Sequence, residues 1–330
     1  GGVNRGIIVQ HGKAFAARDA GFDCHGTCDG VLFANLYVEG GSTSVDGIVM
    51  QGLNCTARDI EVRAIQRYGV LMQNLPTATS YATRVSGVRG AADNAVVLVD
   101  VYGGNITSLQ IDNVVGNGDY LVRVIAKAGN SIARAVTRGV AGSSTLSARG
   151  VQYYANGAGA IINSGGINDC DLALTGGALE AVYLLTDGGG IVDNIVVESI
   201  RAEGGTYGLR MDGATNCVVE ANNAFSGQST GPVGWGAGAG NRGYRYAGSA
   251  TYNPANLVDG DGATTTVTVT GAVLGDAVTE LSFSLALQGI TLTGWVSAAD
   301  TVSVRFQNET GGALNLGSGT LRAATTRMTT

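Results

Sequence analysis

The sequence is poor in proline, histidine and charge. Of its 330 residues, 3 are proline, 2 are histidine and 14% are charged. No stretch keeps a helical periodicity, which argues against a helical bundle, and no apolar run approaches the length of a membrane span. The formal charge is −6 without a basic cluster, so we expect no nucleic-acid partner. No signal peptide is recognisable, and the chain begins with Gly-Gly rather than Met. We therefore expect that an N-terminal attachment region is missing from it.

Cysteine is scarce and odd in number. Five cysteines argue against a disulfide framework. Cys24-His25-x-x-Cys28 has the spacing of half a zinc site, but His11 is the only other histidine and a structural zinc needs four ligands. We expect no metal and no cofactor, and cysteines that pack as small buried hydrophobic side chains.

Glycine and small β-forming residues are abundant. There are 53 glycines without a collagen period, and 45% of the residues are hydrophobic, which is enough to build a core. Threonine, serine and valine are the other prevalent types. The composition therefore predicts an all-β fold.

A short phrase recurs in which a small residue is followed by alternating apolar positions. Gly47-Ile48-Val49-Met50-Gln51 is one copy, and the copies begin at Gly6, Gly47, Gly69, Ala95, Leu121, Gly150, Ala181 and Gly208. The steps between them are 41, 22, 26, 26, 29, 31 and 27 residues. This self-similarity is typical of a solenoid, and the long first step predicts an additional rung or an excursion.

A second apolar alternation follows most copies of the phrase. Asparagines stand just before it, at Asn54, Asn105, Asn194 and Asn216, where a sharp corner would need a left-handed backbone. Two strands per coil with such corners predict a parallel β-helix over residues 1–225. A β-sandwich is the alternative, but it would not return the same phrase in register.

Strand alternation assigns each position of the phrase to the inside or the outside. The outward positions of the middle copies are mostly apolar, and adjacent rungs lie about 4.8 Å apart, so these positions predict a continuous apolar strip. We expect this strip to be an oligomer interface; coverage by loops of the same chain is the alternative. Its members are Val49, Leu71, Val97, Val99, Ile125, Tyr154 and Leu185.

The recurring phrase ends, and the composition changes, after residue 225. Residues 226–250 are rich in glycine and read as a last corner and a linker. Residues 251–330 contain separate alternating strands divided by polar turns, which predict a small antiparallel β-sandwich. We expect this second domain to cap the β-helix or to serve in oligomerisation.

Candidate chemistry gathers on the late copies of the phrase. There is no nucleophile elbow and no phosphate or dinucleotide loop. Asp187 and Asp212 end successive strands and are the candidate catalytic pair, because two carboxylates can hydrolyse a glycosidic bond. Candidate ligand-binding residues are Tyr183, Tyr207, Arg210 and Arg123, since rings stack on sugars and arginine bonds hydroxyls and carboxylates.

The stacked phrases of residues 1–225 resemble right-handed parallel β-helices of the pectate-lyase-like class, which includes bacteriophage tailspikes. Thr264–Ala272, Ser282–Leu285, Gln288–Thr291 and Val304–Gly312 resemble a β module of phage and prophage structural proteins. The catalytic motifs of polygalacturonases and pectate lyases do not match, so no catalytic residue is carried over from them.

The resemblance implies a virion spike or fibre that contacts host surface polysaccharide and acts outside the cell. It further implies a homotrimer that joins other virion proteins through the missing N-terminal region. A polysaccharide depolymerase, acting as a glycosidase or lyase, is the first alternative, and a bacterial surface adhesin is the second.

Overall fold

The structure, a computed structural model, describes residues 4–17, 19–41, 45–73 and 78–329. Within these ranges every regular element is a β-strand and there is no helix, hence none long and apolar enough to cross a membrane. The chain divides into two compact units, Gly1–Ala239 and Gly240–Thr330, and we describe each by itself.

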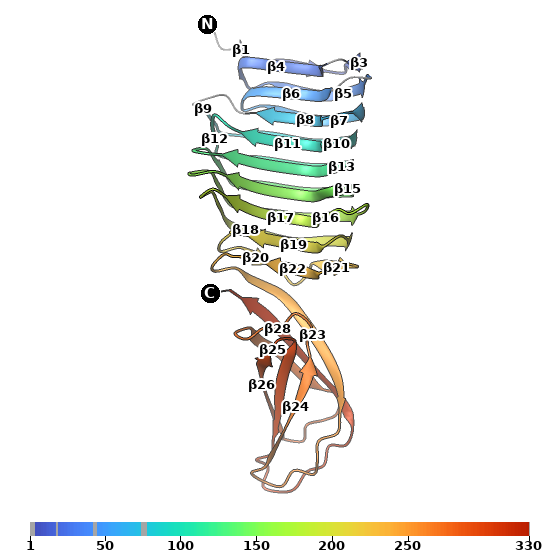
Figure 1. The fold of residues 1–330 in the computed structure, drawn as a ribbon, viewed down its shortest axis with the longest axis vertical. Helices are drawn as coiled ribbons and strands as arrows, with labels where there is room; N and C mark the ends of the chain where they lie inside the picture. Colours follow the sequence, from blue (N-terminus) through green and yellow to red (C-terminus); the bar gives the residue numbers. More distant parts are fainter. Residues whose placement is uncertain (1–3, 18, 42–44, 74–77, 330) are drawn as a thin grey trace. The chain divides into compact units, whose positions relative to one another are not determined.

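The first unit is a parallel β-helix, as the sequence predicts (Figure 1). One of its sheets, which we call the front sheet, carries the functional site described below. Its strands pair in parallel, rung upon rung. They are β4 (Ala20–Asp29), β6 (Asp46–Leu53), β8 (Tyr68–Gln73), β11 (Ala95–Val101), the later parts of β13 (Leu109–Lys127) and β15 (Ala135–Asn156), β17 (Glu180–Asp187), β19 (Tyr207–Asp212) and β22 (Gly231–Trp235).

Two further sheets complete the coil. The longer one, the back sheet, contains β2 (Ile8–Gln10), β3 (Lys13–Ala17), β5 (Leu32–Gly40), β7 (Thr56–Ile65), β10 (Thr83–Ala92), the earlier parts of β13 and β15, β16 (Ile161–Leu174), β18 (Ile191–Gly204), β20 (Val218–Val219) and β21 (Ala224–Ser226). The short one contains β9 (Ala78–Ser80), β12 (Gly104–Ile106), β14 (Ser131–Ala133) and the starts of β16 and β18. At the first rung, β1 (Asn4–Arg5) pairs with the end of β4.

The core consists of stacked columns of apolar side chains. On the front sheet, alternate residues point inward, and these are at most 1% exposed. One column is Ile48, Val70, Val97, Val122, Val151, Val182 and Leu209, and the next is Met50, Met72, Val99, Val124, Tyr153, Leu184 and Met211.

The register predicted for residues 95–99 is wrong by one position. Val97 pairs with Val70 and Val122, and Val99 pairs with Met72 and Val124, so Val97 and Val99 lie in the core and not in an outward strip. Leu98 and Asp100 take the outward places. Residues 95–99 are all apolar and therefore carry no alternation from which the register can be read.

The first copy of the phrase is also misplaced. Ile8 pairs with Leu32 of the back sheet and is 61% exposed, so it does not begin the front columns. The long first step does contain the additional rung, β4, in which Phe22 pairs with Ile48 and Cys24 with Met50.

The predicted corners are largely confirmed. Asn54, Asn194 and Asn216 have φ of 50°, 56° and 53°, in the left-handed region that asparagine tolerates. Asn105 instead accepts hydrogen bonds from the backbone nitrogen and the hydroxyl of Ser131 on the next rung, at 2.8 and 2.9 Å. The five cysteines are buried, as expected, and Cys217 lies in the column of Ile195.

The second unit is the predicted antiparallel sandwich. One sheet pairs β23 (Arg242–Tyr252), β28 (Gly319–Met328) and β25 (Ala277–Phe283), and the other pairs β24 (Gly262–Thr268), β27 (Thr301–Gln307) and β26 (Thr291–Ala298). The side chains between them include Val267, Val302, Val304, Phe306 and Leu321, all fully buried. Residues 226–250 are not a free linker, because β22 adds a rung to β19 and β23 begins at Arg242.

Candidate functional site

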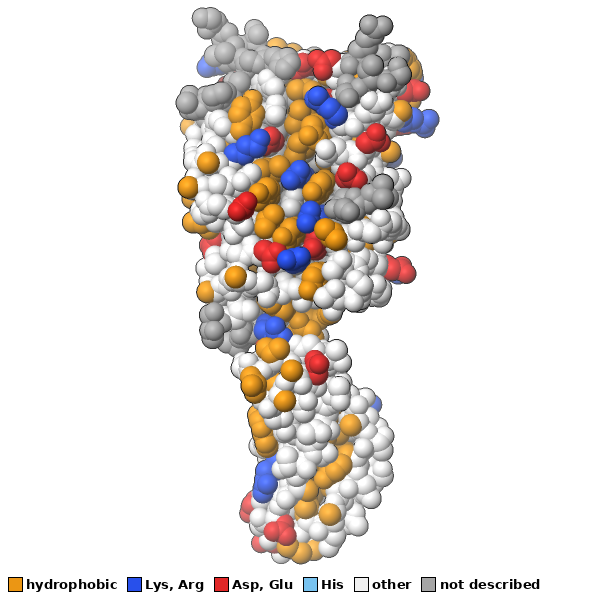
Figure 2. Space-filling model, viewed as in Figure 1, with side chains coloured by type: hydrophobic (Ala, Val, Ile, Leu, Met, Phe, Trp, Pro, Cys, Tyr) orange, Lys and Arg blue, Asp and Glu red, His pale blue; other side chains and the backbone are white. Residues whose placement is uncertain are grey.

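The outward side chains of the front sheet form one continuous surface, which we call the front face. The register stacks them in three columns. In space-filling view, hydrophobic side chains run along the middle of the β-helix, with charged groups of both signs beside them (Figure 2). The front face therefore has an apolar centre with charged side chains on either side (Figure 2).

The apolar side chains of the front face bury one another. Val49, Leu71, Leu98 and Ile125 pack together, with Tyr68, Tyr120 and Tyr154 against them, and the four aliphatic side chains are 4–7% exposed. Val49, Leu71, Ile125, Tyr154 and Leu185 do point outward as predicted. The small exposed area of the aliphatic members leaves little apolar surface for a partner subunit.

The later rungs carry a network of ion pairs. Glu180, which is 1% exposed, accepts from Arg149 at 2.7 Å and lies 3.4 Å from Arg210. Arg210 also pairs with Asp212 at 2.9 Å. These residues come from β15, β17 and β19, about 30 residues apart in sequence, so the sequence alone did not connect them. The network holds the arginines in fixed positions.

Tyr183 has a different role from the one predicted. The guanidinium carbons of Arg149 and Arg210 lie 4.5 and 5.6 Å from its ring centroid, and its hydroxyl donates to Asp212 at 2.6 Å. Burial, together with the hydrogen bond to Asp212, raises the pKa of Tyr183. The ring is only 5% exposed and is no platform for a sugar.

The proposed carboxylate pair lies on neighbouring rungs of this face. Leu185 is the partner of Asp212, and Asp187 follows two residues later on the same strand. Their Cα atoms are therefore about 8 Å apart, from the rung spacing and the rise per residue. Asp187 is exposed and accepts from Tyr154 at 3.4 Å, whereas Asp212 is held by Tyr183 and Arg210.

Four tyrosines of the described front face remain accessible to a ligand. Tyr68, Tyr120, Tyr154 and Tyr207 are half-buried, and the first three pack against the apolar cluster. Burial and the neighbouring Asp187 raise the pKa of Tyr154, and the charge of Arg123 opposes them. Half-buried rings beside fixed hydrogen-bonding groups are suited to stacking on sugar rings and bonding their hydroxyls.

A groove of about 370 Å³ hollows the first rungs of the front face. Asp46 lies at its base, 2% exposed, and is bonded by the Arg67 guanidinium and by the backbone nitrogen of Tyr68. Gln51 donates to Gln73 at 2.7 Å along the same groove. Gln51 and Gln73 end two copies of the recurring phrase, whereas the sequence alone did not connect Asp46 with Arg67.

Asp119 is a second feature that sequence reasoning missed. It precedes Tyr120 on β13, and its backbone nitrogen bonds to the carbonyl of Asp93 on the preceding rung at 3.3 Å. Burial raises the pKa of the Asp119 carboxyl, and the charge of Asp93 adds to the shift. A carboxyl that holds its proton more firmly is a possible proton donor, but nothing else marks this position as a site.

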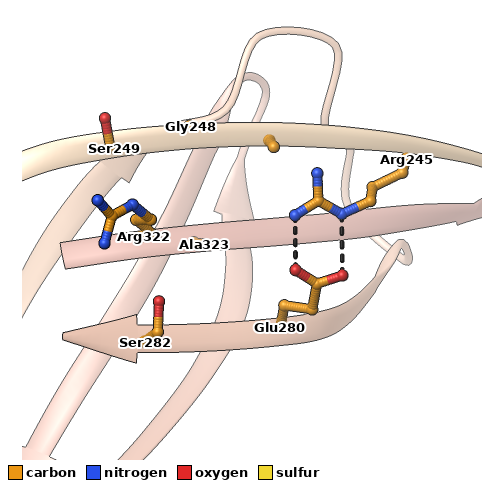
Figure 3. A pocket seen from close by; sticks show the side chains of 8 residues that line it. Arg245, Gly248, Ser249, Glu280, Ser282, Arg322 and Ala323 are labelled. Atoms are coloured by element: carbon orange, nitrogen blue, oxygen red, sulfur yellow. Dashed lines mark hydrogen bonds and ion pairs between the residues drawn. The ribbon is translucent and has the colours of Figure 1, made fainter. Parts of the chain in front are cut away.

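The second unit has a groove of about 360 Å³ over β23, β28 and β25 (Figure 3). Its clearest feature is an Arg245–Glu280 pair with contacts of 2.9 and 2.5 Å. Ser249, Arg322 and Ser282 are cross-strand neighbours beside it. The lining contains no aromatic ring, so the front face is the better candidate for binding sugars. Within the part of the chain that the structure describes, no cluster of His, Cys, Asp and Glu could hold a metal ion.

No protein-family model matches the sequence, and a comparison with curated proteins finds no related sequence. Among solved structures, a mutant tailspike protein of E. coli bacteriophage HK620 superposes with a TM-score of 0.56 at 12% identity, over 98% of this chain and 64% of that chain. A second mutant of that tailspike, in complex with a hexasaccharide, gives 0.44 at 12% identity, over 99% and 67%. The tailspike protein gp49 from Pseudomonas phage LKA1 gives 0.24 at 12% identity, over 91% and 67%.

The first of these similarities confirms the fold that the sequence resemblance implied, a tailspike-like parallel β-helix. The chain spans 64% of the length of that tailspike.

Proposed function

We propose that this chain is the glycan-binding β-helix of a phage tailspike and that it contacts polysaccharide on the host cell surface along its front face. The observation that carries the proposal is the set of half-buried tyrosines on β13, β15 and β19, beside the ion pairs of β15, β17 and β19. Tyr120, Tyr154 and Tyr207 supply ring faces, and Arg149, Glu180 and Arg210 supply charged hydrogen-bonding groups.

The shape of the front face supports a polymer as the ligand. Small-molecule sites are usually enclosed and largely apolar. Here the groups are spread over several rungs of the front face, where an extended chain can meet one set of groups after another. Because ion pairs already hold the arginines, binding costs less side-chain entropy than it would with free side chains.

If the chain is part of a tailspike, its location, oligomeric state and partners follow as further proposals. We assign the chain to the virion, acting outside the host cell, as a homotrimer that is joined to other virion proteins. The fold similarity to a phage tailspike supports this assignment. Since Val97 and Val99 are in the core and the other outward aliphatic residues are mostly covered, we assign the front face to glycan rather than to subunit contact.

A depolymerase is the second candidate function. It is favoured by the position of Asp187 and Asp212 on one face of adjacent rungs, because glycosidases use two carboxylates that flank the scissile bond. Release of reducing ends, or absorbance from unsaturated uronate, that disappears in Asp187→Asn and Asp212→Asn would establish it. Binding without either signal would leave a receptor-binding spike.

The binding proposal is tested by titrating the protein with a panel of bacterial surface polysaccharides and following the equilibrium by calorimetry. Tyr207→Ala should weaken binding to the recognised polymer about five- to hundredfold, if a sugar ring gains from stacking the about 1–3 kcal/mol that a nucleic-acid base gains. Tyr81→Ala is the matched control, because Tyr81 is 71% exposed and lies outside the front sheet. Equal losses in the two variants, or no loss in Tyr207→Ala, would contradict the proposal.

A further inference from the structure

Among the residues that the structure describes, the cations of the front face are, with one exception, paired with carboxylates. Lys127 pairs with Asp100 at 2.8 Å, Arg149 with Glu180 at 2.7 Å and Arg210 with Asp212 at 2.9 Å. On the first rungs Arg67 pairs with Asp46. These groups need no further counter-ion, and they hold the surface in shape.

Arg123 is the exception. Its Nε donates to the side-chain oxygen of Gln152 at 2.8 Å, and its guanidinium carbon lies 4.6 Å from the centroid of Tyr120. Across residues 4–17, 19–41, 45–73 and 78–329, no carboxylate lies within ion-pair distance of it. Its charge therefore has no ion-pair partner among these residues.

The contacts of Arg123 fix the guanidinium and leave its outer end available. Gln152 is 1% exposed and bonds the inner nitrogen, and Tyr120 supports the plane from one side. The two terminal nitrogens make no hydrogen bond to any residue that the structure describes. An arginine fork held in this way matches the two oxygens of a carboxylate or a sulfate.

Neighbouring groups favour an anion over a neutral hydroxyl. Arg123 shares β13 with Lys127 and faces Gln152 of β15, and each of the two nearby cations already has one carboxylate partner. Arg123 is the cation of these rungs that has no such partner among the described residues. A partly desolvated cation gains more from an anion than an exposed one does.

We propose that Arg123 binds an anionic substituent of the glycan, a carboxylate or a sulfate, and that the polysaccharide recognised by the front face is therefore an acidic one. This inference rests on the proposed function. It adds the substrate class and the residue that selects it.

The test measures binding of the whole chain to acidic polymers and to their neutral counterparts. The probes are polygalacturonate, alginate, hyaluronate and colominic acid, each beside its carboxyl-reduced form, together with dextran sulfate and dextran. We expect at least one acidic polymer to bind, and carboxyl reduction or loss of the sulfate to weaken it at least tenfold. The polymer that binds identifies which anion is recognised.

Variants place the effect at Arg123. Arg123→Gln should weaken binding of the acidic polymer at least tenfold, and Arg123→Lys should restore part of it. Arg89→Gln is the matched control, because Arg89 is an exposed arginine of β10 on the back sheet, and it should bind as the parent does. An unchanged unfolding midpoint for each variant separates lost binding from lost folding.

The outcomes distinguish this inference from the function on which it rests. If neutral or carboxyl-reduced polymers bind as tightly as the acidic ones, or if Arg123→Gln binds like the parent, the acidic class is wrong and glycan binding stands. If no polymer of either kind binds, both are wrong.

Discussion

Replacing Glu180 with glutamine tests whether the ion pairs of the front face hold this part of the β-helix in shape. The Glu180 carboxylate is 1% exposed, accepts from Arg149 at 2.7 Å and faces Arg210 at 3.4 Å. Glutamine keeps the size and one acceptor oxygen but removes the charge. Removing one partner of a buried pair typically costs about 3–5 kcal/mol, because the other charge is left uncompensated.

The expected cost is below that range. The side chains of Arg149 and Arg210 are 19% and 40% exposed, so water can still reach both guanidiniums, and Arg210 keeps Asp212 as a partner. We therefore expect Glu180→Gln to lower the free energy of unfolding by about 2–3 kcal/mol. The assay is urea denaturation followed by circular dichroism.

A double-mutant cycle assigns the loss to the pair. Arg149→Met alone, Glu180→Gln alone and the two together should show a coupling energy of at least about 1 kcal/mol. Glu203→Gln is the control, an exposed glutamate on β18, and should change stability by less than about 0.5 kcal/mol. If Glu180→Gln lowers the free energy of unfolding by less than about 0.5 kcal/mol, or if the effects of the two substitutions simply add, the ion pair does not stabilise this part of the β-helix.

Two other predictions concern the core. Tyr153→Phe should cost about 1–2 kcal/mol in the same assay, since the buried phenol bonds Thr137 at 2.9 Å and its loss leaves that buried hydroxyl without its side-chain partner. Burial raises the pKa of Tyr153, so the phenol ionises at lower pH in the unfolded chain than in the folded one. This contribution to stability is complete below about pH 10 and is lost as the pH rises above it. The loss of stability with pH should be smaller in Tyr153→Phe, and equal slopes for the variant and the parent would count against this cause. Val97→Asp buries a charge in the core and should cost about 3–5 kcal/mol, whereas Leu98→Asp meets Arg123 on the next rung and should cost about 1–2 kcal/mol. Similar losses for these two variants would contradict the observed register.

The sequence predicted the fold where the pattern contained its own register. In Gly47–Gln51 and Gly69–Gln73, a glutamine at an outward position ends each apolar run, and both copies lie where alternation placed them. In residues 95–99 there is no polar residue to mark a face, and the register was wrong by one. The copy at Gly6 fits the sequence pattern of the phrase, but its strand, β2, pairs with β5 of the back sheet. The sheet that a copy joins depends on the strands of the neighbouring rungs, which the phrase alone does not specify.

The site was predicted in outline, and its interactions were not. Arg123, Arg210, Asp212 and Tyr183 do lie on one face, as the outward positions implied. That two arginines enclose Tyr183, and that Glu180 joins them, depends on side-chain geometry across strands about 30 residues apart. The spacing of residues within one strand does not predict such contacts between side chains of different strands.

The central claim is that a polysaccharide lies along the front face, and hydroxyl-radical footprinting with the recognised polymer tests it most directly. The account predicts slower oxidation of Tyr120, Tyr154 and Tyr207 when the polymer is bound, with no change at Tyr81 or Trp295, which are 71% and 46% exposed and lie outside the front sheet. Protection confined to Tyr81 or Trp295, with Tyr120, Tyr154 and Tyr207 oxidised at their free rates, would contradict it.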